Sequence, residues 1–283
     1  MRIGLLLLGA VGCGVLLAGL LLWDARPHPR PTVLPGLCEA SAVIPWQDGF
    51  LVGDNETEDR LHGFGPTMEP GAPLPLGTQV EDVEAVTLTP FGPLVVGSMG
   101  TNRKGRAKPM RRRVVVVGYD PLEPDLSGCP ACIRARDLPP KAGGLAVEGA
   151  AWWRGTLWFG LRSPLLDGRA ILLRMEGDPT VALEVAEVVP VDLGGLGIRD
   201  LLVRGDDLFV LAGPTGEGAD APRLFSLSAP GSPPLEVEVV LPGQSEGIAF
   251  LGEDLLVVTD GDGEPGSACR VPATWTRVDL PEP

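Results

Sequence analysis

Five acidic residues in this 283-residue chain each stand at the head of the same short pattern. The acid is followed by a brief apolar run, a tight turn, a second apolar run and a polar or glycine-rich loop, most completely between Glu246 and Gly261. Units of roughly 45 to 65 residues that repeat short apolar strands are typical of β-propeller blades. We therefore expect one carboxylate per blade near a common axis. The acids that begin the five copies are Glu39, Glu84, Glu148, Asp200 and Glu246.

Carboxylates gathered in this way cannot all stay ionised without a compensating charge. Three arrangements would satisfy them, and the sequence leaves all three open. A divalent cation, with Ca²⁺ as the first expectation, suits a set of hard oxygen ligands. Arg162 and Arg199 stand where they could fill the ring with positive charge. Alternatively, each acid accepts a hydrogen bond from the backbone of the next blade and only joins the blades together.

The polar loops that follow the second apolar runs add acids to the same face. Asp54 follows that run in the first unit, and Asp260 and Asp262 follow it in the last. The segment that starts at Asp260 begins like an EF-hand calcium loop, but Val271 stands where the bidentate glutamate is required. We expect these acids to form a rim that either recruits cations or is simply solvated.

A basic loop, Arg103–Arg113, is expected on this face as well. It could hold an anionic ligand or lipid head groups, or remain an exposed loop. The net charge of −14 argues against nucleic-acid binding, because the summed field repels phosphate backbones. The expected ligand is thus a small anion or a divalent cation, with no nucleic acid as a partner.

Four cysteines lie outside the apolar N-terminal segment, an even number that suits an oxidising compartment. Cys38 and Cys269 belong to loops where the first and last blades meet. A disulfide between them would lock the ring, with a chain-entropy gain on the order of 4 to 5 kcal/mol. Cys129 and Cys132 would then pair locally.

The N-terminal residues 1–23 contain an uncharged run, Ile3–Trp23, that is long enough to cross a bilayer as a helix. No small-residue cleavage site follows it, so we expect an uncleaved transmembrane anchor in preference to a signal peptide. Residues 24–36 are proline-rich and are expected to form a stiff tether. The expected location is a bacterial membrane, with the domain facing the periplasm or the cell exterior.

The elements that must position these residues are short β-strands. Residues 37–283 are expected to form an all-β domain, a propeller of five blades, although six remain open because the second unit is overlong. Thr32–Leu34 resembles Val239–Leu241, which precedes the last unit, so it should supply the outermost strand of the last blade. In a four-stranded up-and-down blade, the start of the first strand and the end of the second lie on the same face. The leading acids and the acidic loops should therefore meet at one end of the central channel.

Several phrases resemble a known family. Gly160–Leu165, with its Leu-Arg-Ser-Pro-Leu core, and Ile198–Leu201 are similar to the bacterial domain-of-unknown-function family 3616 over about residues 38–280. That resemblance implies a β-propeller without an established activity. The chain departs from the family at Gly97–Gly100, where the resemblance implies a histidine and Met99 stands instead. The Glu-Gly-Ile-Ala phrase at Glu246 is also similar to phytase-like and esterase-like propellers, which implies calcium and phosphoester chemistry.

These observations predict a membrane-tethered, extracytoplasmic β-propeller that binds a ligand or divalent cation in a carboxylate-lined funnel. One alternative is a calcium-dependent hydrolase of the phosphoesterase or lactonase kind, in which the metal activates water. Another is a scaffold for protein partners. The sequence assigns no catalytic residue and does not decide whether the protein is an enzyme.

Overall fold

Each repeated unit folds as an antiparallel sheet in the computed structural model, which describes residues 30–216, 220–261 and 269–281. We call each sheet a blade. Blade 1 contains β2 (Ala40–Trp46), β3 (Gly49–Asp54), β4 (Arg60–Phe64) and β5 (Leu74–Pro75); blade 2 contains β6 (Val83–Thr89), β7 (Gly92–Gly97) and β8 (Val114–Val116). Blade 3 contains β9 (Ala146–Trp153), β10 (Thr156–Leu166), β11 (Arg169–Asp178) and β12 (Ala182–Val191). Blade 4 contains β13 (Gly197–Arg204), β14 (Asp207–Gly213), β15 (Arg223–Leu227) and β16 (Leu235–Val237).

Blade 5 closes the ring with the two ends of the described chain. It contains β17 (Ser245–Leu251), β18 (Asp254–Thr259), β19 (Thr274–Val278) and, as its outermost strand, β1 (Thr32–Val33). β1 pairs with β19 through Thr32 opposite Trp275 and Val33 opposite Thr274. The strand expected at Thr32–Leu34 therefore has the predicted place.

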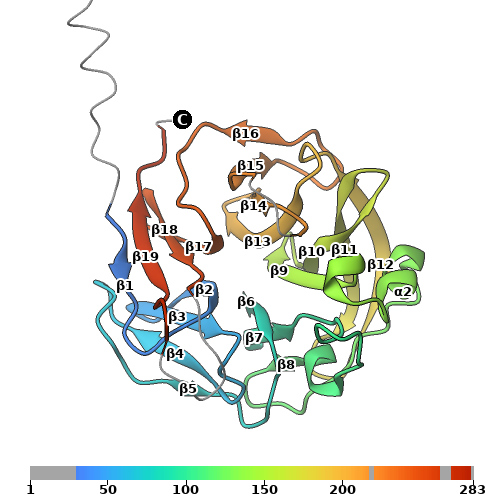
Figure 1. Ribbon diagram of the computed structural model, residues 1–283, viewed down its shortest axis with the longest axis horizontal. Coiled ribbons are helices and arrows are strands. Elements are labelled where there is room, and N and C mark those ends of the chain that lie inside the picture. Colours follow the sequence, from blue (N-terminus) through green and yellow to red (C-terminus); the bar gives the residue numbers. More distant parts are fainter. Residues whose placement is uncertain (1–29, 217–219, 262–268, 282–283) are drawn as a thin grey trace, which may run out of the picture. The chain divides into compact units, whose positions relative to one another are not determined.

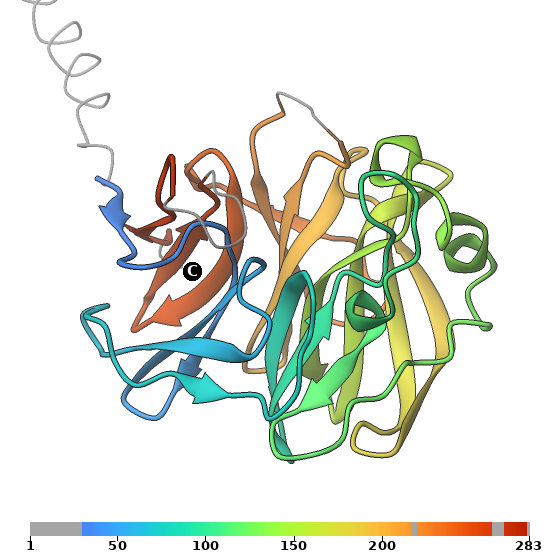
Figure 2. The same cartoon turned by 60° about the horizontal axis from the view of Figure 1, so that its bottom comes forward.

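The sheets of the Pro31–Pro283 unit surround a centre, and the strands β2, β6, β9, β13 and β17 lie innermost (Figure 1). This arrangement confirms the expected all-β propeller with five blades. The side view shows the blades standing side by side, with loops of several blades rising on the same face (Figure 2).

Blade 2 differs from the four-stranded pattern. Its sheet has three strands, and the chain that follows β8 contains the helix α2 (Pro130–Ala135) and the 3₁₀ turn η2 (Pro140–Ala142). The basic loop contains a further 3₁₀ turn, η1 (Pro109–Arg112). The segment after β8 forms single bridges from Leu122 to Val114 and from Asp125 to Glu184 of blade 3. This insertion covers the outer part of blade 2 and explains why the unit is overlong.

Apolar side chains pack between neighbouring blades. Within the described residues, five clusters of buried side chains are each shared by two adjacent blades. For example, Val43 and Val52 of blade 1 pack with Leu256 and Val258 of blade 5. Inner strands are buried on both faces, which accounts for their continuous apolar runs. This packing fixes the distance of each inner strand from the axis.

Both expected disulfides are present. Cys38 is bonded to Cys269, which joins the loop before β2 to the loop before β19. Cys129 is bonded to Cys132 at the start of α2, where both residues are fully buried.

The expected anchor in residues 1–23 lies outside the described residues. Within the part that the structure describes, no helix combines the length and apolar character needed to cross a bilayer.

Candidate functional site

One residue near the start of each innermost strand bulges out of the hydrogen-bonded register. In β6, for instance, Val83 lies opposite Gly97 and Ala85 lies opposite Val96, so Glu84 has no residue directly opposite. A bulge of this kind re-aims the side chain of the extra residue. The five equivalent bulged residues are Ser41, Glu84, Glu148, Arg199 and Glu246.

The equivalent positions therefore carry three carboxylates, one guanidinium and one hydroxyl, where the sequence predicts five carboxylates. In blade 4 the bulged residue is Arg199, one position before the predicted Asp200. In blade 1 it is Ser41, two positions after the predicted Glu39. The prediction that Glu39 and Asp200 are equivalent to the other three acids was therefore wrong. A bulge shifts the strand register by one residue, and sequence spacing does not reveal where the bulge falls.

Asp200 does not line the central cavity. Only 2% of the residue is exposed, and its carboxylate accepts hydrogen bonds from the backbone N–H groups of Leu201 at 2.7 Å and Ile248 at 2.8 Å. Ile248 lies in β17, so the second bond joins blade 4 to blade 5. Burial raises the pKa of Asp200 well above its ordinary value, although both hydrogen bonds favour the charged form. Asp200 thus follows the third arrangement, in which an acid joins two blades.

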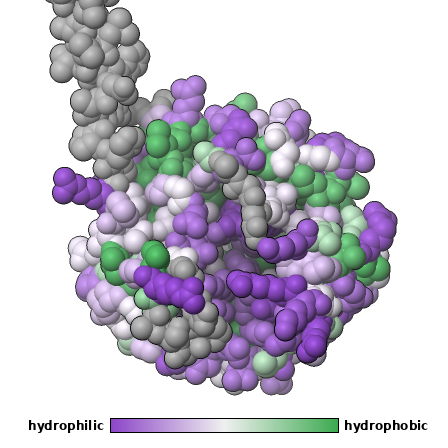
Figure 3. Space-filling model, in the orientation of Figure 1, coloured by the Kyte–Doolittle hydropathy of each residue, from purple (hydrophilic) through white to green (hydrophobic). Residues whose placement is uncertain are grey.

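The five bulged side chains line a cavity of about 330 Å³, which we call the funnel. Hydrophilic side chains surround the hollow at the centre of this face (Figure 3). Arg162 of β10 and loop residues before the first strands and after the second strands complete the lining; the loop residues include Glu39, Asn55, Asp220 and Asp260. The described lining holds six carboxylates and two guanidiniums, so its net charge is negative when all are ionised.

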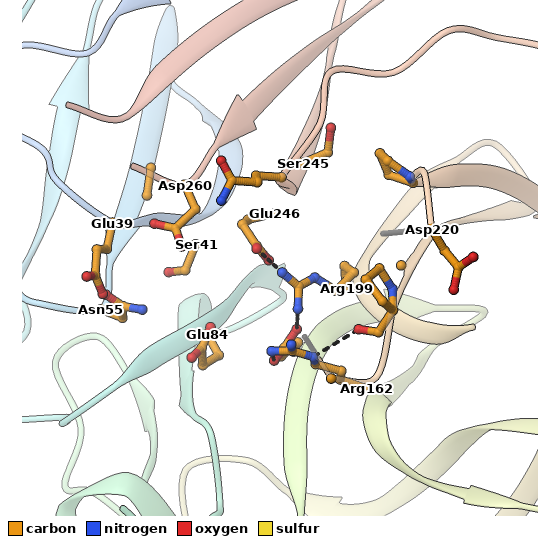
Figure 4. Close-up of a pocket in the computed structure, with 17 residues that line it drawn as sticks. Glu39, Ser41, Asn55, Glu84, Arg162, Arg199, Asp220, Ser245, Glu246 and Asp260 are labelled. Carbon is orange, nitrogen blue, oxygen red and sulfur yellow. Dashed lines mark hydrogen bonds and ion pairs between the residues drawn. The ribbon is translucent and has the colours of Figure 1, made fainter. Parts of the chain in front are cut away.

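Arg162 and Arg199 occupy one side of the funnel together with two of the acids (Figure 4). Glu148 binds both arginines, because Nη1 of Arg162 is 3.0 Å from its Oε1 and Nη1 of Arg199 is 3.0 Å from its Oε2. Nη2 of Arg199 is also paired with Glu246. We call these four residues the arginine–glutamate chain. It includes residues of blades 3, 4 and 5. For Glu148 and Glu246, it corresponds to the second of the three expected arrangements, in which arginines compensate the acids.

Backbone contacts hold the two arginines in place. Nε of Arg162 donates to the carbonyl oxygen of Pro214 at 3.2 Å. The residue before Pro214 is Gly213, and a Cβ there would lie 3.0 Å from Cγ of Arg199. Glycine at this position therefore leaves the room that the Arg199 side chain needs.

Glu39, Glu84 and Asp260 lie on the other side of the funnel (Figure 4). No basic side chain among the described residues forms an ion pair with Glu84 or Asp260. Burial raises the pKa of Glu84 well above its ordinary value, and the charges of Asp82 and Glu148 raise it further. Burial, followed by the charge of Glu39, raises the pKa of Asp260 to about 7. We call Glu84 and Asp260 the uncompensated acids.

Asp54, the predicted rim acid of blade 1, is not part of the funnel lining. Asp54 is buried, and its carboxylate accepts hydrogen bonds from the backbone N–H groups of Cys38 at 3.1 Å and Glu56 at 2.8 Å, so it shapes the loops where the ring closes. Asp262 lies outside the described residues. Of the two predicted rim acids that the structure describes, Asp260 lies in the cavity wall and Asp54 does not.

The basic loop is largely paired within blade 2. Lys108 lies 3.0 Å from Glu81, Arg111 lies 2.8 Å from Asp82, and Arg112 lies 2.9 Å from Asp137. None of the loop's basic residues is part of the funnel lining in the described structure. These contacts hold the loop to neighbouring segments and do not supply an anion site in the cavity.

No metal site is seen among the described residues, and bound Ca²⁺ stays a prediction. Among them, no three His, Cys, Asp or Glu side chains lie close enough together to hold a metal ion. Glu148 is occupied by two arginines and Glu246 by one, which removes two of the expected ligands. Ca²⁺ takes six to eight oxygen ligands, so a calcium site in the funnel would need donors besides Glu148 and Glu246.

Sequence reasoning missed five polar lining residues, which are Ser41, Asn55, Asp220, Gln244 and Ser245. Ser41 donates a hydrogen bond from Oγ to the carbonyl oxygen of Val83 at 2.5 Å, which joins blade 1 to blade 2. Its position opposite the Asp54 loop could have been found by aligning the bulged residues, since each stands next to a buried small or apolar residue. No comparable signal marks Asn55 or Gln244.

The resemblance expected from the sequence is confirmed in part of the chain. The family described as "Protein of unknown function (DUF3616)" matches residues 129–229. These residues include Glu148, Arg162 and Arg199 of the arginine–glutamate chain. No curated protein sequence matches the chain.

Solved structures share the fold at low sequence identity. The chain is similar to an exo-beta-1,3-galactanase from Phanerochaete chrysosporium, with a TM-score of 0.51 and 9% identity over 89% of this chain and 65% of that one. It is also similar to a GH43_1 enzyme from Xanthomonas citri, with a TM-score of 0.51 and 11% identity over 90% and 92% of the two chains. The periplasmic gluconolactonase of Pseudomonas aeruginosa reaches a TM-score of only 0.34, at 12% identity over 87% and 68% of the two chains. The first two likenesses show the fold alone, and the third carries no argument.

Proposed function

We propose that this chain is an extracytoplasmic binding protein whose funnel takes a small ligand bearing a positively charged group. One observation carries the proposal: Glu84 and Asp260 line the cavity, and no basic side chain of the described residues is paired with either. Glu148 and Glu246, in contrast, are already compensated by arginines. We therefore expect a cation that enters the funnel to be attracted to the side that holds Glu84 and Asp260.

Burial makes this side favourable for a cation and unfavourable for an anion. Taking a carboxylate out of water is costly unless an opposite charge or a proton accompanies it. The raised pKa values of Glu84 and Asp260 reflect that cost. A bound ammonium group would supply the missing charge and release the protons. An organic cation also needs fewer protein oxygens than calcium does, which agrees with the lack of a three-acid group in the described residues.

The proposed location outside the cytoplasm is supported by two disulfides, one of which joins the blades that meet at ring closure. Disulfides persist in oxidising compartments and are rare in the cytosol. The N-terminal apolar run would hold the propeller at the membrane. We propose that the protein works at the outer side of a bacterial membrane.

Calorimetric titration of the full-length chain tests the proposal. Butylamine, putrescine and calcium chloride are titrated separately into the wild type, Glu84→Gln and Asp260→Asn. We expect an amine to bind, and each substitution to weaken its affinity about tenfold, equivalent to about 1.4 kcal/mol. Glu176→Gln is the matched control, because Glu176 is exposed in an outer strand of blade 3 and should bind as the wild type does.

The outcome also separates the kinds of cation. Binding of calcium with no binding of either amine would assign the charge to a metal and refute the organic ligand. If neither the amines nor calcium bind, or if both funnel variants bind like the control, the proposed function is wrong.

A further inference from the structure

The two arginines of the funnel differ in how far their side chains are exposed to the cavity. Arg199 is 11% exposed at its side chain and is paired through Nη1 with Glu148 and through Nη2 with Glu246. Arg162 is 29% exposed and uses Nε on the Pro214 carbonyl and Nη1 on Glu148. Its Nη2 has no partner among the described residues. Nη1 of Arg199 also lacks a hydrogen bond, although it lies 3.0 Å from Glu148, but that nitrogen is buried. Arg162 is therefore the more accessible of the two guanidiniums.

Arg162 and the two uncompensated acids lie on opposite sides of the funnel, whose lining also holds Glu39 and Asp220. The half-exposed guanidinium of Arg162 lies on one side, and Glu84 and Asp260 lie on the other (Figure 4). A guanidinium edge binds carboxylates with directed, charge-assisted hydrogen bonds. A simple cation would leave the Arg162 donor unpaired once the ligand displaced its water, and a simple anion would face a lining that holds more acids than bases.

Resting on the proposed function, we infer that the ligand is a zwitterion, with an ammonium group directed to Glu84 and Asp260 and a carboxylate directed to Arg162. Amino acids and short peptides have this chemistry. The cavity of about 330 Å³ is at the small end of ligand pockets and suits a compact molecule of this kind. Arg162 then acts as the residue that selects for the carboxylate.

The arginine–glutamate chain prepares Arg162 for this role. Glu148 Oε1 and the Pro214 carbonyl hold two edges of the guanidinium, so its orientation is set before a ligand arrives. A preorganised donor binds a carboxylate with less loss of conformational entropy. Because Arg199 is also paired with Glu148, removal of Arg162 leaves that acid compensated, and the funnel should keep its shape.

The test compares compounds of matched length that differ in charged groups. The full-length chain is titrated calorimetrically with 4-aminobutyrate, 6-aminohexanoate, alanine and alanyl-alanine as zwitterions, butylamine as the cation and butyrate as the anion. We expect at least one zwitterion to bind about tenfold more tightly than butylamine, and butyrate not to bind.

Two variants identify the group responsible. Arg162→Gln should remove the advantage of the zwitterion over butylamine, whereas Glu84→Gln should weaken the binding of both compounds. Arg174→Gln, a change at an exposed arginine of blade 3, is the control and should alter neither affinity. Thermal unfolding of each variant confirms that it is folded.

Failure of the inference differs from failure of the proposed function. If butylamine binds as tightly as every zwitterion, or if Arg162→Gln weakens both compounds equally, the ligand is not selected by its carboxylate and the inference is overturned while cation binding stands. If no compound with an ammonium group binds, both are wrong.

Discussion

Replacing Arg199 with methionine should destabilise the propeller strongly, because two buried acids depend on this arginine. Its Nη1 is 3.0 Å from Oε2 of Glu148, and its Nη2 is paired with Glu246. The side chains of Glu148 and Glu246 are only 5% and 12% exposed. Methionine has a similar length and fills the space without a charge.

The expected size follows from the environment of the pairs. Removing one partner of a buried ion pair costs about 3 to 5 kcal/mol, because the other charge stays buried without compensation. Glu148 keeps Arg162 as a partner, whereas Glu246 keeps no ion pair among the described residues. We expect a loss of about 3 kcal/mol in the free energy of unfolding at pH 7.5. The loss should shrink at pH 5, where a proton can more easily neutralise the buried acid that has lost its arginine.

Urea unfolding followed by tryptophan fluorescence and circular dichroism measures this loss. Arg174→Met is the matched control, because the Arg174–Glu187 pair is exposed on blade 3 and should contribute at most about 1 kcal/mol. The triple variant Arg199→Met, Glu148→Gln, Glu246→Gln should recover most of the stability, since no buried charge is left unpaired on either acid. Equal losses in Arg199→Met and Arg174→Met would refute the reasoning.

Three further predictions concern the ring. Asp200→Ala should lower the free energy of unfolding, measured in urea, by about 2 to 4 kcal/mol, because two backbone N–H groups lose their buried acceptor. The control Asp207→Ala, at an exposed residue, should change it by less than about 0.5 kcal/mol. Equal effects of the two substitutions would contradict the role of Asp200 in joining blades. Cys38→Ser should lower the free energy of unfolding by about 5 kcal/mol and Cys129→Ser by about 2 kcal/mol, because the first disulfide spans 231 residues and the second spans 3. A larger loss for Cys129→Ser than for Cys38→Ser in urea unfolding would contradict this reasoning. Because the pKa of Asp260 is raised to about 7, the folded chain keeps a proton that the unfolded chain has lost above about pH 4. The free energy of unfolding should therefore fall as the pH rises from about 4 to 7, and Asp260→Asn should flatten that slope in thermal unfolding at several pH values; an unchanged slope would speak against it.

The repeated pattern of acid, apolar run, turn and apolar run was enough to predict the five blades and the closing strand at Thr32–Val33. Blade identity depends on period-two alternation and buried runs, which are visible in a single sequence. The pairing of Cys38 with Cys269 followed from the same blade assignment. The outer part of blade 2 could not be predicted, because the segment after β8 pairs through single bridges and a short helix, which lack a periodic signal.

The sequence predicted many of the residues that line the funnel, but it predicted less of how their side chains are arranged. Glu84, Glu148, Glu246, Arg162 and Arg199 were expected, and all of them line the funnel. Asp200 was misplaced because the bulge in β13 falls at Arg199, and a shift of one residue sends the side chain to the other face. Which acids pair with an arginine depends on which side chains of neighbouring blades come into contact. Sequence spacing does not predict those contacts.

The most direct test measures how many protons the chain releases when a ligand binds in the funnel. Burial raises the pKa of Glu84 well above its ordinary value and that of Asp260 to about 7, so both acids keep their protons to a higher pH than a free carboxyl group does. A cation bound beside them must displace those protons, since it favours the charged form. We propose to titrate the full-length chain at pH 7 with the amine or amino acid that binds most tightly, in phosphate and in Tris buffers, which differ in ionisation enthalpy. The account predicts net proton release on binding, and less release from Glu84→Gln. Binding with the same heat in both buffers would contradict it.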